Sequence, residues 1–260
     1  MACGIISGFH ATQSPIVART IQSEREARAT FYGMMIAEGV IAMIWAAAAL
    51  AMYNLAPENL HLAPAEVLGE ITRHFLGPWM GGVTVLGVVV LAITSGDTAL
   101  RSTRLSLSEM LHVPQAKFSA RLSITLPLMV VVSALLWWSN QSAKSFSHLW
   151  NYFAWGNQVL SASTLMACTV WMLSEGRKAA ATAALIPGMF MTSVVACFIL
   201  WTSSDKGQPV GLVPGGMPLP AAIGVAVVVA FVFAAYVFRR GRGMASDAGG
   251  TPPSICPPEP

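Results

Sequence analysis

The chain has 260 residues, of which 55% are hydrophobic and only 10% are charged. Soluble domains carry about 25% charged residues, so this composition excludes an ordinary water-soluble protein and indicates a chain whose solvent is a bilayer. The basic residues lie in short separate clusters without interleaved aromatic residues, which argues against nucleic-acid binding. We find no nucleophile–base pattern, metal-ligand spacing or phosphate loop, and therefore expect neither an enzyme nor a bound metal or cofactor.

Six apolar runs are long enough to cross a membrane, which takes about 20 residues. They cover residues 34–53, 79–97, 122–138, 148–173, 180–202 and 219–238. The fourth run is diluted by Asn, Gln, Ser and Thr, and we expect it to face other helices rather than lipid. The sequence thus predicts an all-α polytopic membrane protein, with about six spans in a transmembrane domain over residues 1–240 and a disordered tail over residues 241–260.

The Lys and Arg residues orient these runs. If the segment before the first run is cytoplasmic, 12 of the 15 Lys and Arg residues fall in cytoplasmic segments, and Arg73, Lys144 and Lys206 remain outside. The positive-inside rule requires such an excess. We therefore expect a multi-pass protein with its C-terminus in the cytoplasm.

Three segments outside the runs have local signals. The loop over residues 54–78 mixes acidic, His and apolar residues and predicts a short amphipathic helix. Residues 98–112 predict a helix that continues out of the membrane or lies on its inner surface. Ser14 and Pro15 predict a helix start, because Ser caps helices and Pro suits their first turn.

Two acidic residues, Glu38 and Asp97, lie within or against the apolar runs. An ionised carboxylate in hydrocarbon costs on the order of 3 kcal/mol or more, so such a residue usually faces a cavity, a partner or a transported species. They therefore favour a channel or transporter. The alternatives are a structural Glu38 near the inner interface and an ion pair between Asp97 and Arg101, four residues on.

Residues 3–15 mix apolar residues with Gly, Ser, His and Gln and are too short to span a membrane. They predict an interrupted helix, whose free backbone groups can bind ions and anionic substrates. The alternative is a helix packed closely through Gly4 and Gly8. His10 is a candidate proton carrier because histidine changes charge near neutral pH, or it is simply hydrogen-bonded. Thr94 and Ser95 offer hydroxyl ligands for a small cation.

At these residues the sequence resembles the carbon starvation protein A (CstA) transporter family. Residues 3–15 (CGIISGFHATQSP) resemble its CGxISGFHxTQSP signature, residues 31–39 (FYGMMIAEG) its FYGxMIxEG stretch, and residues 94–102 (TSGDTALRS) its TSGDTAxRS stretch. The three motifs occur in the family's order and spacing. The resemblance is densest over residues 2–110 and continues more loosely through the later runs.

The resemblance implies uptake of pyruvate or peptides across the bacterial inner membrane during carbon starvation, driven by an H⁺ or Na⁺ gradient. It also implies the inverted repeat of five plus five helices found in LeuT-like transporters of amino acids, polyamines and organocations, with residues 1–15 ending a broken helix. The substrate-binding candidates are then Gly4, Ser7, Gly8, His10 and Gln13, and the candidates for proton or ion coupling are Glu38, Thr94, Ser95 and Asp97.

Members of this family are much longer, and their N-terminal half has no counterpart in this chain. A substrate site at a repeat interface is incomplete with one repeat. We therefore expect this chain to be the C-terminal half of such a transporter or one piece of a split one, with the N-terminal half or a second copy as partner. The alternative function is a membrane assembly module that does not transport by itself.

Overall fold

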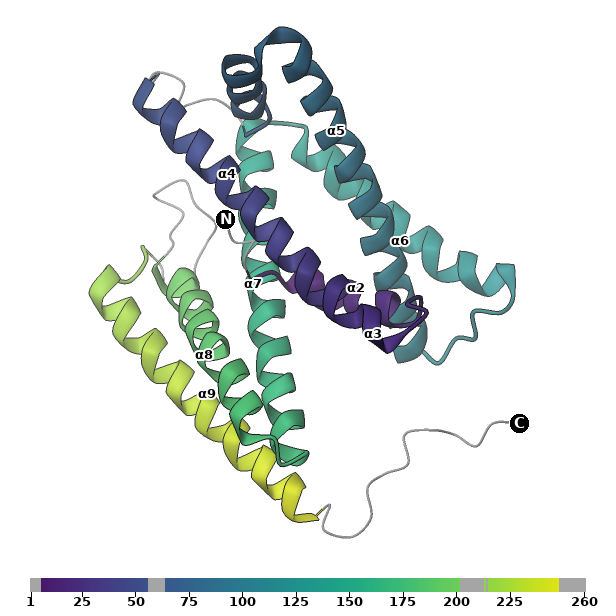
Figure 1. The fold of residues 1–260 in the computed structure, drawn as a ribbon, viewed down its shortest axis with the longest axis vertical. Coiled ribbons are helices and arrows are strands. Elements are labelled where there is room, and N and C mark those ends of the chain that lie inside the picture. The colour runs from purple at the N-terminus through teal and green to yellow at the C-terminus, as the bar shows by residue number, and fades with distance from the viewer. Residues whose placement is uncertain (1–5, 56–63, 202–212, 214, 248–260) are drawn as a thin grey trace. The chain divides into compact units, whose positions relative to one another are not determined.

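The structure is a computed structural model that describes residues 6–55, 64–201, 213 and 215–247. It consists of two compact units, Met1–Leu149 and Trp150–Pro260. All regular secondary structure in the described ranges is helical (Figure 1), which confirms the all-α prediction.

Within its described residues, the first unit contains six helical elements: α2 (Gly8–Ala18), α3 (Glu24–Ala27), the π-helix η1 (Arg28–Gly33), α4 (Met34–Leu55), α5 (Pro64–Met110) and α6 (Phe118–Ser139). The second unit is built from α7 (Ala143–Ser174), whose first turns belong to the first unit, α8 (Lys178–Trp201) and α9 (Leu219–Asp247).

The prediction that a helix starts at Ser14 and Pro15 is wrong, because α2 begins at Gly8. Ser7 is its cap: it has extended backbone, and its Oγ accepts a hydrogen bond from the Phe9 N–H at 3.1 Å. The hydroxyl of Ser14 instead donates backwards to the His10 carbonyl at 2.7 Å. Ser14 thus lies inside α2 and does not start it, and Pro15 lies in the second half of the same helix.

α3, η1 and α4 follow one another directly as a continuous helical stretch over residues 24–55. Ser23 caps this stretch by accepting a hydrogen bond from the Arg25 N–H at 3.3 Å. Glu24 and Glu26 lie in the first turn, where their negative charges interact favourably with the positive end of the helix dipole. η1 inserts a wider π-turn just before the apolar run begins.

α5 is two helices joined at Gly77, whose φ of 75° and ψ of 175° break the helix before Pro78. The part before the break confirms the short helix expected within residues 54–78, and it buries Ile71 and Thr72 while Arg73 is exposed. It folds against the following part so closely that a Cβ on Gly81 would lie 3.0 Å from the Thr72 carbonyl oxygen.

The second part of α5 runs on to Met110, which confirms the helix predicted to continue beyond the apolar run. There Ser102 is buried, and its hydroxyl donates to the Thr12 carbonyl of α2 at 2.8 Å. α5 also packs against α4 and α6. It is therefore the element on which the rest of the first unit is assembled.

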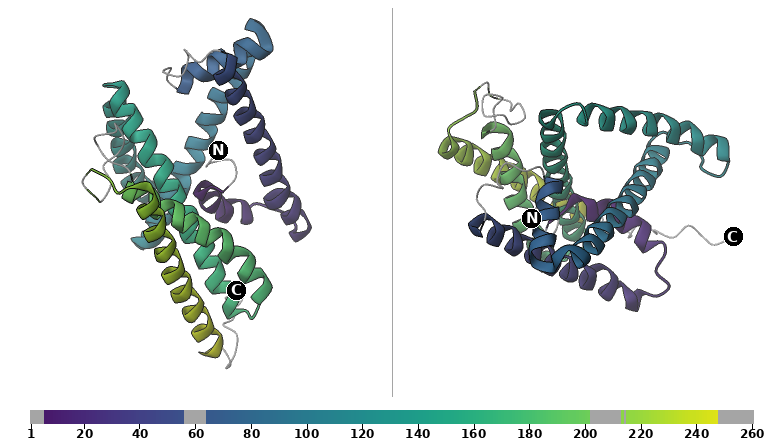
Figure 2. Two further views of the ribbon diagram at one scale, coloured as in Figure 1. Left: turned by 90° about the vertical axis from the view of Figure 1, so that its left-hand side faces the viewer. Right: turned by 90° about the horizontal axis from the view of Figure 1, so that it is seen from above.

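In the second unit, α8 and α9 lie side by side along their length (Figures 1 and 2). α9 presents a buried stripe of alanines at every fourth position, which lets the helix backbones approach closely: Ala222, Ala226, Ala230 and Ala234. α7 contacts both helices, because a Cβ on Gly188 of α8 would lie 3.2 Å from Leu165 Cβ and one on Gly241 of α9 would lie 2.8 Å from Leu173 Cβ.

α7 carries three of its polar residues inward. Gln158, Ser161 and Thr169 are buried, with Thr169 fully inaccessible. The Trp155 indole N–H donates to the Val195 carbonyl of α8 at 3.4 Å. These contacts confirm that the most polar of the six runs faces other helices.

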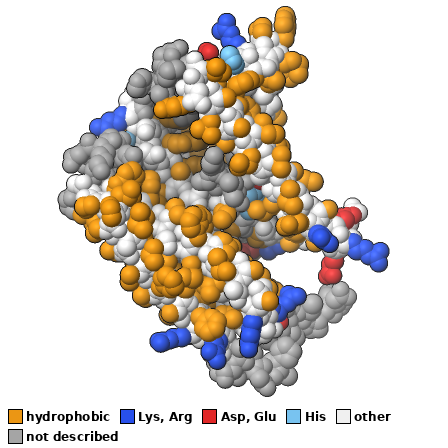
Figure 3. All heavy atoms as spheres, turned by 60° about the vertical axis from the view of Figure 1, so that its left-hand side comes forward, with side chains coloured by type: hydrophobic (Ala, Val, Ile, Leu, Met, Phe, Trp, Pro, Cys, Tyr) orange, Lys and Arg blue, Asp and Glu red, His pale blue; other side chains and the backbone are white. Residues whose placement is uncertain are grey.

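Five helices in the described ranges are long and apolar enough to cross a membrane: Glu24–Leu55, Glu66–Met110, Phe118–Ser139, Lys178–Trp201 and Leu219–Met244. The polytopic architecture is thereby confirmed, and α7 as a sixth span stays a prediction. Apolar side chains cover much of the face in Figure 3, where Lys and Arg side chains stand at its edges. α9 extends to Asp247, past the expected domain boundary at residue 240.

Candidate functional site

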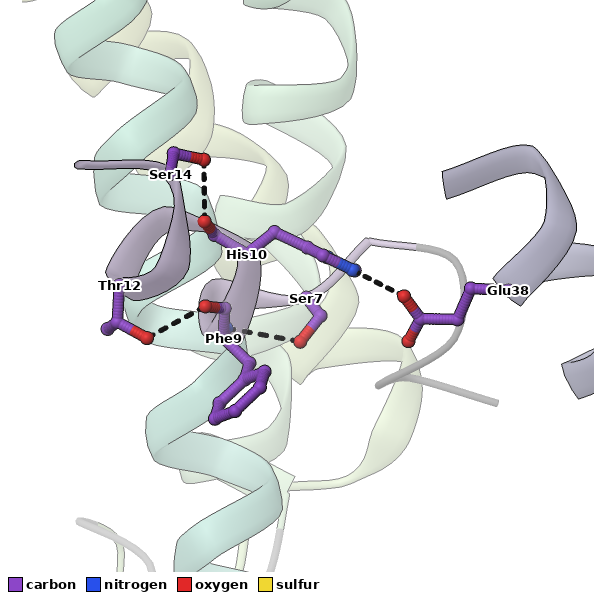
Figure 4. A network of polar contacts seen from close by, with 6 residues as sticks. All are labelled: Ser7, Phe9, His10, Thr12, Ser14 and Glu38. Atoms are coloured by element: carbon purple, nitrogen blue, oxygen red, sulfur yellow. Dashed lines mark hydrogen bonds and ion pairs between the residues drawn. The ribbon is translucent and has the colours of Figure 1, made fainter. Parts of the chain in front are cut away.

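The first unit brings together two candidate residues that are 28 positions apart in the sequence. The His10 side chain on α2 reaches the Glu38 side chain on α4, with 2.6 Å between Nε2 and Oε2 (Figure 4). The two residues were expected to act individually, and the structure makes them one hydrogen-bonded pair. The imidazole nitrogen and the carboxylate oxygen are thus in direct hydrogen-bond contact, with no atom between them.

The pair is partly shielded. The His10 side chain is 23% exposed and the Glu38 side chain 47%. The other ring nitrogen of His10, Nδ1, is buried and has no hydrogen-bond partner in the part of the chain that the structure describes. Among the described residues, Glu38 alone holds the imidazole by a side-chain hydrogen bond, and the second ring nitrogen is shielded from solvent.

Short-range hydrogen bonds fix the backbone that carries His10. Ser7 caps the helix, Thr12 Oγ1 donates to the Phe9 carbonyl at 2.7 Å, and Ser14 Oγ donates to the carbonyl of His10 itself (Figure 4). The Ser102 bond then ties α2 to α5. These contacts hold the imidazole at a defined position relative to the rest of the first unit.

The other substrate-binding candidates are placed around the same helix. Ser7 and Gly8 are buried at the start of α2. Gln13 lies three residues after His10, so the two side chains occupy neighbouring turns. Its Nε2 is buried and, like His10 Nδ1, lacks a hydrogen-bond partner among the described residues. Gly4 lies outside the described residues, and with it the expected interruption of the helix.

The remaining coupling candidates lie apart from this pair. Asp97 forms an ion pair with Arg101, with 3.1 Å between Oδ2 and Nη2, and both side chains are more than half exposed. That geometry matches the local alternative left open by the sequence. The Thr94 hydroxyl donates to the Leu91 carbonyl of its own helix at 2.9 Å, and Ser95 is half-buried on the same helix.

Sequence reasoning missed the pairing of His10 with Glu38, because no spacing rule relates residues on different helices. It also missed Arg104, whose Nε is buried without a partner in the described ranges. The same ranges hold no group of three or more His, Cys, Asp or Glu side chains that could bind a metal ion.

Comparison with known proteins places these residues in a family. The family model described as "Carbon starvation protein CstA" matches residues 1–75 and 56–197. The chain belongs to the carbon starvation protein CstA family. His10, Glu38 and Asp97 all lie within the matched residues, and the membrane-spanning helices agree with a membrane protein of this family.

Two relatives of this CstA-family chain come from Haemophilus influenzae. One, described as "Uncharacterized protein", is 39% identical over 133 residues, which are 51% of this chain and 90% of the relative. The other, described as "Uncharacterized membrane protein", is 55% identical over 54 residues, which are 21% of this chain but only 15% of that relative. No solved structure gives a significant match.

Proposed function

We propose that this CstA-family chain forms part of a secondary transporter that takes up pyruvate or peptides across the bacterial inner membrane, coupled to protons. The family match and the five membrane-spanning candidates support the transporter class. The single observation that carries the coupling proposal is the 2.6 Å contact between His10 and Glu38.

The pair suits a proton better than a metal cation. With one shared proton, His10 and Glu38 together are electrically neutral, and a second proton gives the pair a positive charge. His10 Nδ1 and Gln13 Nε2 have no hydrogen-bond partner in the described part of the chain, and a positive pair together with these groups would attract a carboxylate. Proton loading and anion binding at α2 would therefore favour one another, as symport requires.

The test is uptake of radiolabelled pyruvate in cells that lack their own pyruvate carriers. The chain is expressed alone and together with the N-terminal half of a full-length relative, at two external pH values. We expect uptake only in the pair of halves, and more of it at acid pH. Membrane-inserted protein with no uptake of pyruvate or peptides in either case would contradict the transporter proposal.

Variants in that assay separate coupling from binding. Glu38→Gln keeps a hydrogen-bonding side chain but removes the proton site, so pH-driven accumulation should fall about tenfold or more while exchange of internal for external pyruvate persists. Glu26→Gln is the matched control, because Glu26 is an exposed acid of α3 outside the pair. Accumulation that survives Glu38→Gln and His10→Gln would remove the proton-coupling role of the pair.

A second candidate is a subunit of a split transporter or an assembly module. It is favoured by the first Haemophilus relative, of which the matched segment makes up 90%. Purification of a tagged chain from cells that also express an N-terminal half distinguishes the two candidates. Co-purification with uptake supports a split transporter, whereas co-purification without uptake supports an assembly role.

A further inference from the structure

A pocket of about 360 Å³ lies between α5 and α6 in the first unit, and neither His10 nor Glu38 is among its lining residues. α5 supplies its charged wall, with Asp97, Arg101 and Arg104, and α6 supplies an apolar floor that includes Leu128 and Met129. This combination of charge on one wall and hydrocarbon on the other requires an explanation, because the proposed transport function does not use it.

The charges of this pocket do not balance. Asp97 is paired with Arg101 at 3.1 Å, which leaves Arg104 as the second guanidinium in a lining that has one acid. Arg104 Nε is buried and lacks a hydrogen-bond partner within the described residues. A buried donor without a partner is costly, so the pocket is built for a ligand with one negative charge that accepts hydrogen bonds.

The position of the pocket along the helices indicates what kind of anion it takes. The apolar part of α5 from Trp79 to Asp97 is about 27 Å long at 1.5 Å per residue, close to the thickness of a bilayer core of about 30 Å. Arg101 and Arg104 therefore lie at the depth of the lipid headgroups. Leu128 and Met129 lie about two turns inside the apolar run of α6, at the depth of the first acyl carbons.

We propose that this pocket binds an anionic phospholipid of the inner leaflet, with the phosphodiester on Arg104. A guanidinium presents two parallel N–H groups that match two phosphate oxygens. The orientation predicted from the Lys and Arg distribution places this end of α5 on the cytoplasmic side, where anionic lipid headgroups meet basic pockets between helices. Exposed apolar side chains continue away from the pocket along both helices: Ile93 on α5 and Leu126 and Val130 on α6. They offer a path for the acyl chains.

The test uses the purified full chain in a neutral detergent and measures its unfolding temperature. The titrants are phosphatidylglycerol, phosphatidylcholine, sodium phosphate and sodium pyruvate. We expect phosphatidylglycerol to raise the unfolding temperature in a saturable way, with little effect of the other three. Arg104→Gln should raise the half-effective phosphatidylglycerol concentration about tenfold, the effect of losing one charge-assisted hydrogen-bond pair.

Three further variants make this test specific. Arg104→Lys keeps the charge but loses the planar fork, and should fall between the parent and Arg104→Gln. Leu128→Trp fills the pocket without changing any charge and should weaken the lipid effect in a chain whose Arg104 is intact. Arg25→Gln removes an exposed charge from α3 and should leave the half-effective phosphatidylglycerol concentration unchanged.

Several results would overturn the proposal. Equal effects of Arg104→Gln and Arg25→Gln would mean general electrostatic attraction, and equal effects of the two lipids would mean general lipid solvation. Stabilisation by phosphate or pyruvate that matches phosphatidylglycerol would make this a site for a soluble anion instead.

Discussion

The hydrogen bond between His10 and Glu38 gives each side chain a polar partner, which the hydrocarbon of a membrane cannot supply. A carboxyl group near hydrocarbon needs a hydrogen-bond partner, and α2 brings the imidazole Nε2 to it. The bond joins α2 to α4, so it also stabilises the packing of the first unit. The same two side chains thus have a structural role and a proposed chemical one, and the two roles can be measured separately.

The structural role is measured with a double-mutant cycle. We expect His10→Ala and Glu38→Ala to show a coupling free energy of about 1 kcal/mol, as found for hydrogen bonds between membrane helices. The measurement is unfolding of the purified chain by sodium dodecyl sulfate. A parallel cycle of His10→Ala with Glu26→Ala, at an exposed acid of α3, should give a coupling near zero, and equal coupling in both cycles would contradict the pairing.

Residue pairs differ in how far the sequence predicts them. The pairing of Asp97 with Arg101 follows from their spacing, since residues four apart on a helix are neighbours. The pairing of His10 with Glu38 depends on how α2 and α4 pack, and neither segment alone contains that information. For the same reason, the burial of Arg104 Nε without a hydrogen-bond partner among the described residues becomes visible only in the folded first unit.

The apolar runs of the sequence predicted that these helices exist and roughly how long they are. Local hydrogen bonds determine the residues at which each helix begins and ends. The run predicted over residues 122–138 became α6, Phe118–Ser139, because polar residues on either side still complete the helical turns. The start of α2 was predicted seven residues late. Both Ser7 and Ser14 precede helix-forming residues, and only the direction of each hydroxyl bond separates a cap from an internal serine.

The two parts of α5 provide an element-scale prediction. Gly81→Ala should lower the free energy of unfolding by about 1–3 kcal/mol, because the new Cβ would lie 3.0 Å from the Thr72 carbonyl oxygen and backbone cannot move aside easily. Gly82→Ala is the adjacent control. Its Cβ meets nothing within 4 Å, so it should be neutral or stabilise the helix by up to about 1 kcal/mol.

Unfolding in sodium dodecyl sulfate again measures both variants. Equal effects of the two substitutions would show that the helix break at Gly77 does not fold the short part of α5 onto Gly81.

For the whole molecule, the distribution of Lys and Arg predicts a topology that labelling can check. In a chain whose four cysteines are replaced by serine, Ala116→Cys lies between α5 and α6 and Gln141→Cys between α6 and α7. We expect a membrane-impermeant maleimide to label Gln141→Cys in intact cells, and Ala116→Cys only in inverted vesicles. The opposite pattern would reverse the orientation and would place the α5–α6 pocket in the outer leaflet.

Composition was sufficient to predict a helical membrane protein, because so few charges cannot cover a soluble surface. It was not sufficient to predict which helices pack together. α7 was recognised as a helix that faces others from its polar residues, and Thr169 and Gln158 are indeed buried. That α8 pairs with α9 through an alanine stripe follows from the match of two surfaces, which only the folded second unit displays.

The π-helix η1 makes one segment tolerant of a change in length. The side chains of residues 28–33 are exposed or half-buried, so substitutions there should be well tolerated. A one-residue deletion should be tolerated too, because it converts the π-turn to an α-turn. A π-turn holds one more residue than an α-turn, so the helix beyond it keeps nearly the same rotation relative to α3, and Glu38 still faces His10. A deletion in the regular α-helix between Met34 and Glu38 would instead rotate Glu38 by about 100°. Natural variation in η1 is therefore expected to include the loss of one residue as well as changes in residue identity.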